Sequence, residues 1–256
     1  MKRRELILCF LTIMACASQA ASQSRSTEPV ARIEEIKIDD SSIDTTTDQV
    51  QIKRAGTAAW ENARKEALLF ADDMVQAFRA TVRMKYVLDP ERVITLNRGG
   101  KLEIRTGADE GIVPNLFLIF GELFARVKGH FRVQTVQGEA VVKGTKFLVR
   151  YPYEKDTTIV VVFDGQVTLV LANKTVLVSS PAAGSIVGKG SIGLNPGVDV
   201  DAIKEQCSRW ADVDDGFWLW KPKYYVPIGA GIVGGVILYE VLKTKYTEVD
   251  LTIVWH

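Results

Sequence analysis

The sequence predicts a mostly β protein, a compact antiparallel all-β domain of the sandwich or solenoid kind, from three observations. Residues 101–198 contain many short apolar runs, separated by Gly, Asn or Asp, and many short strands at this spacing indicate an all-β domain. Residues 131–136 alternate apolar and polar side chains, as a half-buried strand does. The pair Asp164-Gly165 separates two apolar runs and predicts a hairpin turn between them.

The composition excludes several classes of function. The chain has 256 residues, of which 47% are hydrophobic, so it has ample material for a core. Its net charge of +1 gives no electrostatic case for nucleic acid, which usually needs a basic patch. Cys9 and Cys16 lie in a predicted targeting segment, which leaves Cys207, and His130 and His256 are the two histidines. We therefore expect no metal, no cofactor and no nucleic-acid partner.

Residues 1–20 are predicted to be a secretory signal peptide. A basic stretch at 2–4 precedes an apolar run at 6–14, and small residues precede the expected cleavage point. We expect an exported protein that is periplasmic, or membrane-anchored and facing the periplasm. Lipidation at Cys16 is an alternative, because the residues before it resemble a lipobox. Residues 21–47 are rich in Ser, Thr, Asp and Glu and predict a linker.

Residues 58–79 support either a helix or strands. Apolar residues recur there at three- and four-residue intervals, which favours an amphipathic helix; they are Trp60, Ala63, Ala67, Phe70, Met74 and Phe78. Residues 82–88 then alternate apolar and polar side chains, which favours a strand. Further short strands are predicted at 93–96 and 101–105.

Residues 138–149 are the most informative stretch. Two Val-containing apolar runs, each too short for a helix, flank the step Gly144-Thr145, and β-branched residues favour strands. We expect Gly144 to supply a special backbone angle or close packing, because a glycine within a strand marks a bulge or a close approach. Thr145 is expected to make a local hydrogen bond, and Phe147 to fill the core.

Three segments together resemble the FecR domain family. They are Phe131-Arg132-Val133-Gln134-Thr135, Gly144-Thr145-Lys146-Phe147-Leu148-Val149 and Phe163-Asp164-Gly165-Gln166-Val167. The resemblance implies a FecR-type β domain over residues 48–190, in which Gly144, Thr145, Phe147 and Gly165 form the fold motif.

The resemblance extends back toward Trp60 and Asp73, where it favours strands over a helix. Two positions in this region depart from the family pattern, because Glu66 and Asp72 stand where family members have glycine. These departures keep the helix at 58–79 open.

The resemblance also implies a function. It implies a non-enzymatic extracytoplasmic protein for envelope signalling or interaction, with an envelope protein as its partner. Regulatory family members carry a cytoplasmic N-terminal helical segment that contacts a sigma factor, whereas a predicted signal peptide stands here, which argues against sigma-factor contact. The alternative is a carbohydrate- or peptidoglycan-binding or scaffolding β module, for which Trp210, Trp218 and Trp220 are candidate stacking residues.

An enzyme has little support from the sequence, and we predict no catalytic residue. Asp72 and Asp73 are the tight acidic pair of this region, but adjacent side chains on a strand point to opposite faces. Ser179-Ser180 has no histidine that the sequence places beside it. A nucleophile, a base and an orienting group therefore cannot be assembled.

The C-terminal part suggests a membrane anchor. Residues 191–224 are expected to be a linker with a short helix at 200–210. Residues 225–242 form an apolar run near the minimum of about 17 residues for a membrane span. Aromatic residues before the run are typical of a membrane interface, and two glycines within it suit close helix contact. The interface residues are Trp218, Trp220, Tyr224 and Tyr225, and the contact residues are Gly231 and Gly235.

The tail at 243–256 gives the alternative to a membrane span. Its Val249, Leu251, Ile253 and Trp255 alternate with other residues as a strand does, and a lone strand needs a sheet to join. The apolar run would then be a buried segment whose tail pairs with the β domain.

Overall fold

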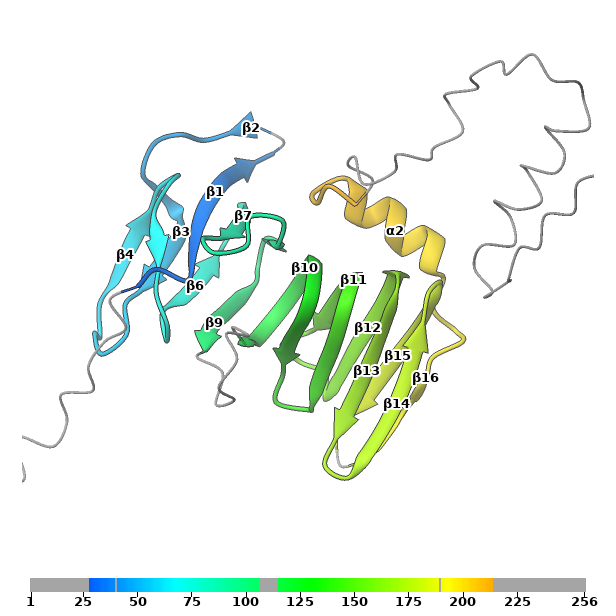
Figure 1. Cartoon of the computed structure of the whole chain (residues 1–256). Coiled ribbons are helices and arrows are strands. Elements are labelled where there is room, and N and C mark those ends of the chain that lie inside the picture. The colour runs from blue at the N-terminus through cyan, green and yellow to red at the C-terminus, as the bar shows by residue number, and fades with distance from the viewer. Residues whose placement is uncertain (1–27, 40, 106–114, 189, 214–256) are drawn as a thin grey trace, which may run out of the picture. The chain divides into compact units, whose positions relative to one another are not determined.

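The computed structural model describes residues 28–39, 41–105, 115–188 and 190–213 (Figure 1). These residues form one antiparallel sheet of sixteen strands and one helix. The first strands are β1 (Ala31–Ile38), β2 (Ser41–Ser42), β3 (Thr47–Lys53), β4 (Trp60–Ala63), β5 (Leu68–Leu69), β6 (Met74–Ala77), β7 (Thr81–Tyr86), β8 (Val93–Leu96) and β9 (Lys101–Arg105). They are followed by β10 (Asn115–Gln134), β11 (Glu139–Tyr151), β12 (Thr157–Asp164), β13 (Gln166–Leu171), β14 (Lys174–Ser179), β15 (Ala182–Val187), β16 (Ser191–Leu194) and helix α2 (Val200–Ser208).

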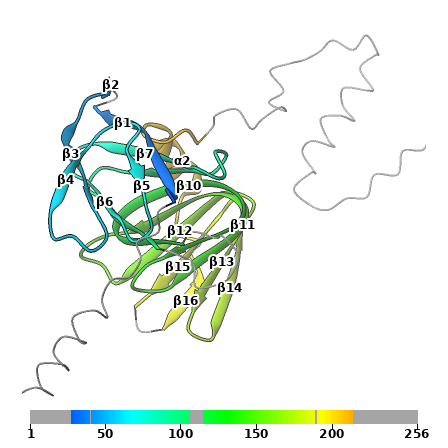
Figure 2. The same cartoon turned by 60° about the vertical axis from the view of Figure 1, so that its left-hand side comes forward.

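The two longest strands, β10 and β11, connect the two halves of the sheet. The main strand order is β16-β15-β12-β11-β10-β8-β7-β1-β2, and β9 joins β10 to a branch made of β6, β3 and β4. Figure 2 shows β10 and β11 curving as they cross the sheet. The predicted fold class, mostly β and antiparallel, is therefore confirmed, and it takes the form of one branched, curled sheet.

One hydrophobic core runs through both halves of the sheet. It includes Ile33 of β1, Leu102 of β9, Phe131 of β10 and Ile186 of β15, each with 2% or less of its surface exposed. The alternation of buried and half-buried residues along β7 and β9 follows the two-residue period of a strand. Burial of this apolar face is the main favourable contribution to folding.

The expected linker at 21–47 is wrong for the part of it that the structure describes. Strand β1 pairs with β7 and buries Ala31, Ile33 and Ile36. A register shift between Ile33 and Glu35 places the last two buried positions, Ile33 and Ile36, three residues apart rather than two. This bulge breaks the apolar alternation, which explains why the sequence did not predict a strand here.

The helix considered at 58–79 is also wrong, and strands β4, β5 and β6 occupy this region. Glu66 and Asp72 both have a φ of +64°, which a right-handed helix does not allow. Each is the third residue of a turn closed by a backbone hydrogen bond, from Ala67 to Arg64 and from Asp73 to Phe70. These two turns interrupt the two-residue alternation of apolar residues between one strand and the next. The apolar residues of this region therefore recur at helical intervals by coincidence.

The hairpin predicted at Asp164-Gly165 is a bend instead. Strands β12 and β13 do not pair with each other; both pair with β11, along Lys146–Arg150 and along Glu139–Val142 respectively. The chain therefore continues in the same direction past Gly165. A glycine between two apolar runs gives the same local signal for a bend as for a turn.

The expected linker at 191–224 is partly structured. Strand β16 extends the sheet at β15, and the predicted short helix coincides with α2. Asp199 caps this helix, because its carboxylate accepts a hydrogen bond from the backbone N–H of Ala202 at 3.0 Å. A second apolar cluster, with Phe124, Leu148 and Cys207 at its centre, joins α2 to the face of β10, β11 and β12 opposite the main core.

Several predictions fall outside the described residues. They are the signal peptide at 1–20, the candidate span at 225–242 and the tail at 243–256. Within the described ranges, no helix is both long and apolar enough to cross a membrane.

Candidate functional site

The four motif residues meet at the corner where β11 and the β12–β13 strands bend together. Gly144 and Gly165 have φ values of +70° and +84°. A Cβ at Gly165 would lie 2.7 Å from the carbonyl oxygen of Gly144. The two backbone segments therefore approach too closely to leave room for a side chain at Gly165.

Thr145 and Phe147 hold the same corner from within. The Thr145 hydroxyl donates a hydrogen bond of 2.9 Å to the backbone carbonyl of Gln166, across the corner rather than within its own turn. The Phe147 side chain has no exposed surface and belongs to the main core. None of the four motif residues lines either cavity described below.

The acidic pair Asp72-Asp73 has a structural arrangement. Asp72 is exposed, whereas Asp73 has no exposed surface. The Asp73 carboxylate accepts hydrogen bonds from the Arg54 guanidinium at 2.7 Å and from the backbone N–H groups of Ala55 and Phe70, both at 3.0 Å. The buried charge is thus paired and hydrogen-bonded, which is the condition for its burial.

Other reactive groups lie apart from one another in the part of the chain that the structure describes. His130 is exposed on β10 opposite Lys143. Among the described residues, no group of three His, Cys, Asp or Glu side chains is placed to hold a metal. Burial raises the pKa of the Cys207 thiol to about 12, with a smaller contribution from Glu122. The thiol is therefore protonated and unreactive at neutral pH.

The candidate membrane residues lie beyond the described ranges. They are Trp218, Trp220, Tyr224, Tyr225, Gly231 and Gly235, together with the candidate lipidation site Cys16.

The main candidate site is a cavity of about 340 Å³, which we call the basic groove. It lies between the end of α2 and the ends of β1, β7 and β8. Its lining residues are Lys37, Asp39, Arg79, Thr81, Asn97, Arg98, Gln206, Arg209 and Trp210. Four cationic side chains thus face one carboxylate, in a protein whose net charge is only +1.

The arginines of the basic groove have no ionic partner within the described residues. Lys37 forms an ion pair with Glu35 at 3.2 Å. Arg79, Arg98 and Arg209 are exposed, and none of their guanidinium groups forms an ion pair or a hydrogen bond with any other described residue. The groove therefore presents uncompensated positive charge, which attracts anions to it.

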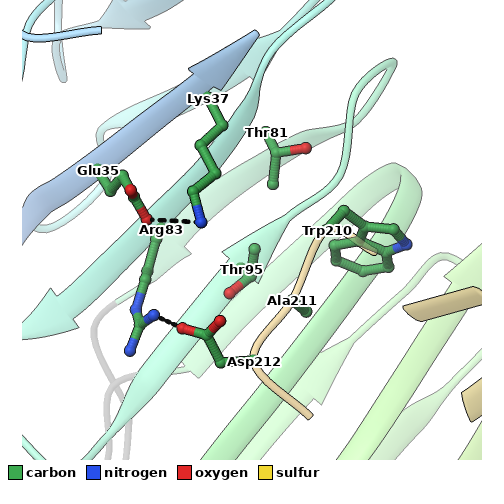
Figure 3. A pocket seen from close by; sticks show the side chains of 8 residues that line it. All are labelled: Glu35, Lys37, Thr81, Arg83, Thr95, Trp210, Ala211 and Asp212. Atoms are coloured by element: carbon green, nitrogen blue, oxygen red, sulfur yellow. Dashed lines mark ion pairs between the residues drawn. The ribbon is translucent and has the colours of Figure 1, made fainter. Parts of the chain in front are cut away.

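A smaller cavity of about 10 Å³ adjoins the groove (Figure 3). Figure 3 shows Lys37 turned toward Glu35 and Arg83 turned toward Asp212, and both pairs are salt bridges. Arg83 also pairs with Glu34 at 2.9 Å. These contacts attach the chain after α2 to β7, so the wall of the groove that carries Arg209 is tied to the sheet.

Trp210 lines both cavities. Its ring packs against the second apolar cluster, and its indole Nε1 is buried without a hydrogen-bond partner among the described residues. The sequence singled out this tryptophan for stacking but not the arginines around it. The groove brings together residues near 37, 79, 98 and 209, and no local spacing in the sequence signals such a combination.

The comparisons with known proteins bear on the central part of the chain. Residues 77–168 match the family model described as FecR protein, which confirms the resemblance over that stretch. The stretch is less than half of the chain and runs from the end of β6 into β13. Of the groove residues, Arg79, Thr81, Asn97 and Arg98 lie inside it, and the others lie outside. No curated protein matched the chain.

Two solved structures resemble part of the chain. Both are crystal structures of a candidate anti-sigma factor from Parabacteroides distasonis, at 2.50 and 1.65 Å resolution. Each is 21% identical to this chain and covers 41% of it, with TM-scores of 0.36 and 0.37. The chain spans about half of their length, 52% in each case, and no functional conclusion follows from likeness at this level.

Proposed function

We propose that this chain is a non-enzymatic FecR-like protein of the cell envelope that takes part in signalling or interaction by binding another protein. The FecR match at 77–168 supports the family context. The basic groove is the observation that carries the proposal, because it is an open site with charge available for a partner.

The chemistry of the described residues supports binding rather than catalysis. Asp73 is engaged by Arg54, and Cys207 is buried and protonated. His130 stands exposed on β10, away from these groups. The basic groove holds arginines, a lysine, amides, a threonine, a tryptophan and the carboxylate of Asp39. The cationic and amide groups can orient and neutralise anions, and no hydrogen bond pairs the Thr81 hydroxyl with Asp39 as a nucleophile with its base among the described residues.

The proposal places the protein on the outer side of the cytoplasmic membrane. The predicted signal peptide at 1–20 and the candidate span at 225–242 support this location. The peptidoglycan-binding alternative has less support, because Trp210 is half-buried against the second apolar cluster rather than presented as a flat platform.

A crosslinking experiment in cells tests the proposal. A photo-crosslinking residue is introduced at Phe78, which is 44% exposed beside Arg79, and separately at Val136, which is 67% exposed in the turn between β10 and β11. We expect one discrete protein adduct from position 78 and none from position 136. Adducts of equal yield at both positions, or none at either, would contradict a specific protein partner.

The location is tested on the same cells. Protease added after the outer membrane is opened should digest the protein, and protease added to intact cells should not. Protection that persists until the cytoplasmic membrane is lysed would rule out an exported β domain.

A further inference from the structure

From the charge and construction of the basic groove, we infer that it takes an acidic segment of the partner, an extended peptide that presents two or three carboxylate side chains. This inference rests on the proposed function, because it names the chemistry of the protein that binds. It adds a site and a type of ligand that the FecR match does not give, since five of the nine lining residues lie outside residues 77–168.

The arginines of the basic groove come from different parts of the fold. Arg79 lies in the turn between β6 and β7, Arg98 in the turn after β8, and Arg209 is the C-cap residue of α2. Three separate elements thus bring guanidinium groups to one cavity. Each guanidinium can donate two parallel hydrogen bonds to one carboxylate, so three arginines suit several carboxylates rather than a single charge.

A carboxylate that contacts the lining of the groove, Glu122, is already neutralised. Glu122 forms an ion pair with Arg150 at 2.6 Å and accepts a hydrogen bond from the Asn97 side chain at 2.9 Å. Arg150 also donates to Gln206 at 3.4 Å. This network occupies the carboxylate of Glu122. The lining carboxylate, Asp39, forms no ion pair with the three arginines among the described residues, so they are left to an external anion.

Carbonyl groups at the end of α2 already accept hydrogen bonds. The Cys207 carbonyl accepts backbone hydrogen bonds from Trp210 and Ala211, and the Glu205 carbonyl accepts one from the Ser208 hydroxyl. These bonds offset the negative end of the helix dipole, which would otherwise repel an anion.

Size and exposure favour a peptide over a small enclosed ligand. A volume of about 340 Å³ is at the lower end for small-molecule sites, which bury most of the ligand surface. Arg79, Arg98 and Arg209 are all exposed, so they would hold charges at a rim, as in the polar margin of a protein interface. Phe78, 44% exposed next to Arg79, offers an apolar contact for the same segment.

The test is a binding measurement on the purified full chain. The probe is a fluorescein-labelled peptide in which glutamates alternate with glycine and serine, and its control has glutamine at each glutamate. We expect the glutamate peptide to bind at least about tenfold more tightly, because each exposed ion pair contributes about two- to fivefold. Salt at about 1 M should remove most of this difference, because it shortens the Debye length to about 3 Å.

Substitutions connect the binding to the groove. The triple variant Arg79→Gln, Arg98→Gln, Arg209→Gln should bind the glutamate peptide at least about tenfold more weakly, by the same charge argument. The matched control is Arg64→Gln, which changes an exposed arginine in the turn before β5. Strand β5 pairs with the start of β1, whereas the groove residue Lys37 lies near the other end of β1, so Arg64 is remote from the groove. This control should bind as the unsubstituted chain does, and circular dichroism should show that both variants fold.

Four results would overturn the inference. The glutamine peptide could bind as tightly as the glutamate peptide, the triple variant could keep its affinity for the glutamate peptide, or Arg64→Gln could lose as much affinity as the triple variant. In the fourth result, citrate or inorganic phosphate would displace the glutamate peptide at concentrations below that of the peptide. The last result would assign the groove to a small anion. An adduct at position 78 that persists in the triple variant would overturn the inference and leave the proposed function standing. Absence of that adduct in the unsubstituted chain would instead count against the proposed function, whatever the peptide does.

Discussion

Two regions of the sheet adopt the same rare backbone conformation in different surroundings. At the motif corner, Gly144 and Gly165 have φ values of +70° and +84°, and in the N-terminal turns Glu66 and Asp72 both have +64°. The left-handed conformation costs a residue with a Cβ about 1–2 kcal/mol. Glu66 and Asp72 are exposed, whereas Gly165 faces the backbone of Gly144 at close range. Crowding, more than the dihedral angle, decides where only glycine fits.

The largest effect is expected at the residue that anchors the corner in the core. Phe147→Ala removes a side chain with no exposed surface and should lower the free energy of unfolding by about 3–5 kcal/mol. Urea denaturation followed by circular dichroism measures this change. Tyr153→Ala, at a side chain that is 82% exposed, serves as the control and should change little. A loss below about 1 kcal/mol for Phe147→Ala would mean that the corner repacks without the ring.

The next effect separates crowding from the dihedral angle. In Gly165→Ala, the new methyl group would lie 2.7 Å from the Gly144 carbonyl oxygen and 3.2 Å from the Thr145 hydroxyl. The conformational cost and the overlap together should lower the free energy of unfolding by about 2–4 kcal/mol. The same urea titration measures it. A loss no larger than that of Gly144→Ala would show that the backbone moves apart at little cost.

Gly144→Ala should have a smaller effect at the same corner. Nothing lies within 4 Å of a Cβ built at Gly144, so only the left-handed φ opposes the substitution. We expect a loss of about 1–2 kcal/mol in the free energy of unfolding, measured in parallel with Gly165→Ala. A larger loss than at Gly165 would reverse the role given to crowding.

The sequence predicted the strands whose signals are local. The alternation along β7 and β9 is visible in the printed residues, and the same alternation supports the predicted fold class. The sequence did not predict strand β1, because a bulge after Ile33 shifts the spacing of its buried residues. The sequence predicts a hairpin at Gly165 where the structure has a bend, because the difference between the two depends on how β12 and β13 pair with β11, and the local residues do not show this pairing.

The candidate site was less accessible to prediction than the fold. The motif residues were found because they are adjacent in the sequence and resemble a family pattern. Arg79, Arg98 and Arg209 were not, because a net charge near zero conceals a local excess. Only the folded chain brings their three elements together, so the composition gives no sign of the positive charge that lines the groove.

The smallest effect tests the other half of the comparison, at the exposed turns. Glu66→Gly and Asp72→Gly relieve the left-handed strain but add conformational freedom to the unfolded chain, so each should raise the free energy of unfolding by only about 0.5 kcal/mol. Glu66→Gly also removes the exposed ion pair with Arg32, which contributes little. Urea midpoints of the two variants measure the gain, and Glu61→Gly in β4, where the φ is not positive, is the control and should lose stability. A loss in Glu66→Gly and Asp72→Gly like that of the control would show that their side chains, rather than the backbone angle, hold these turns.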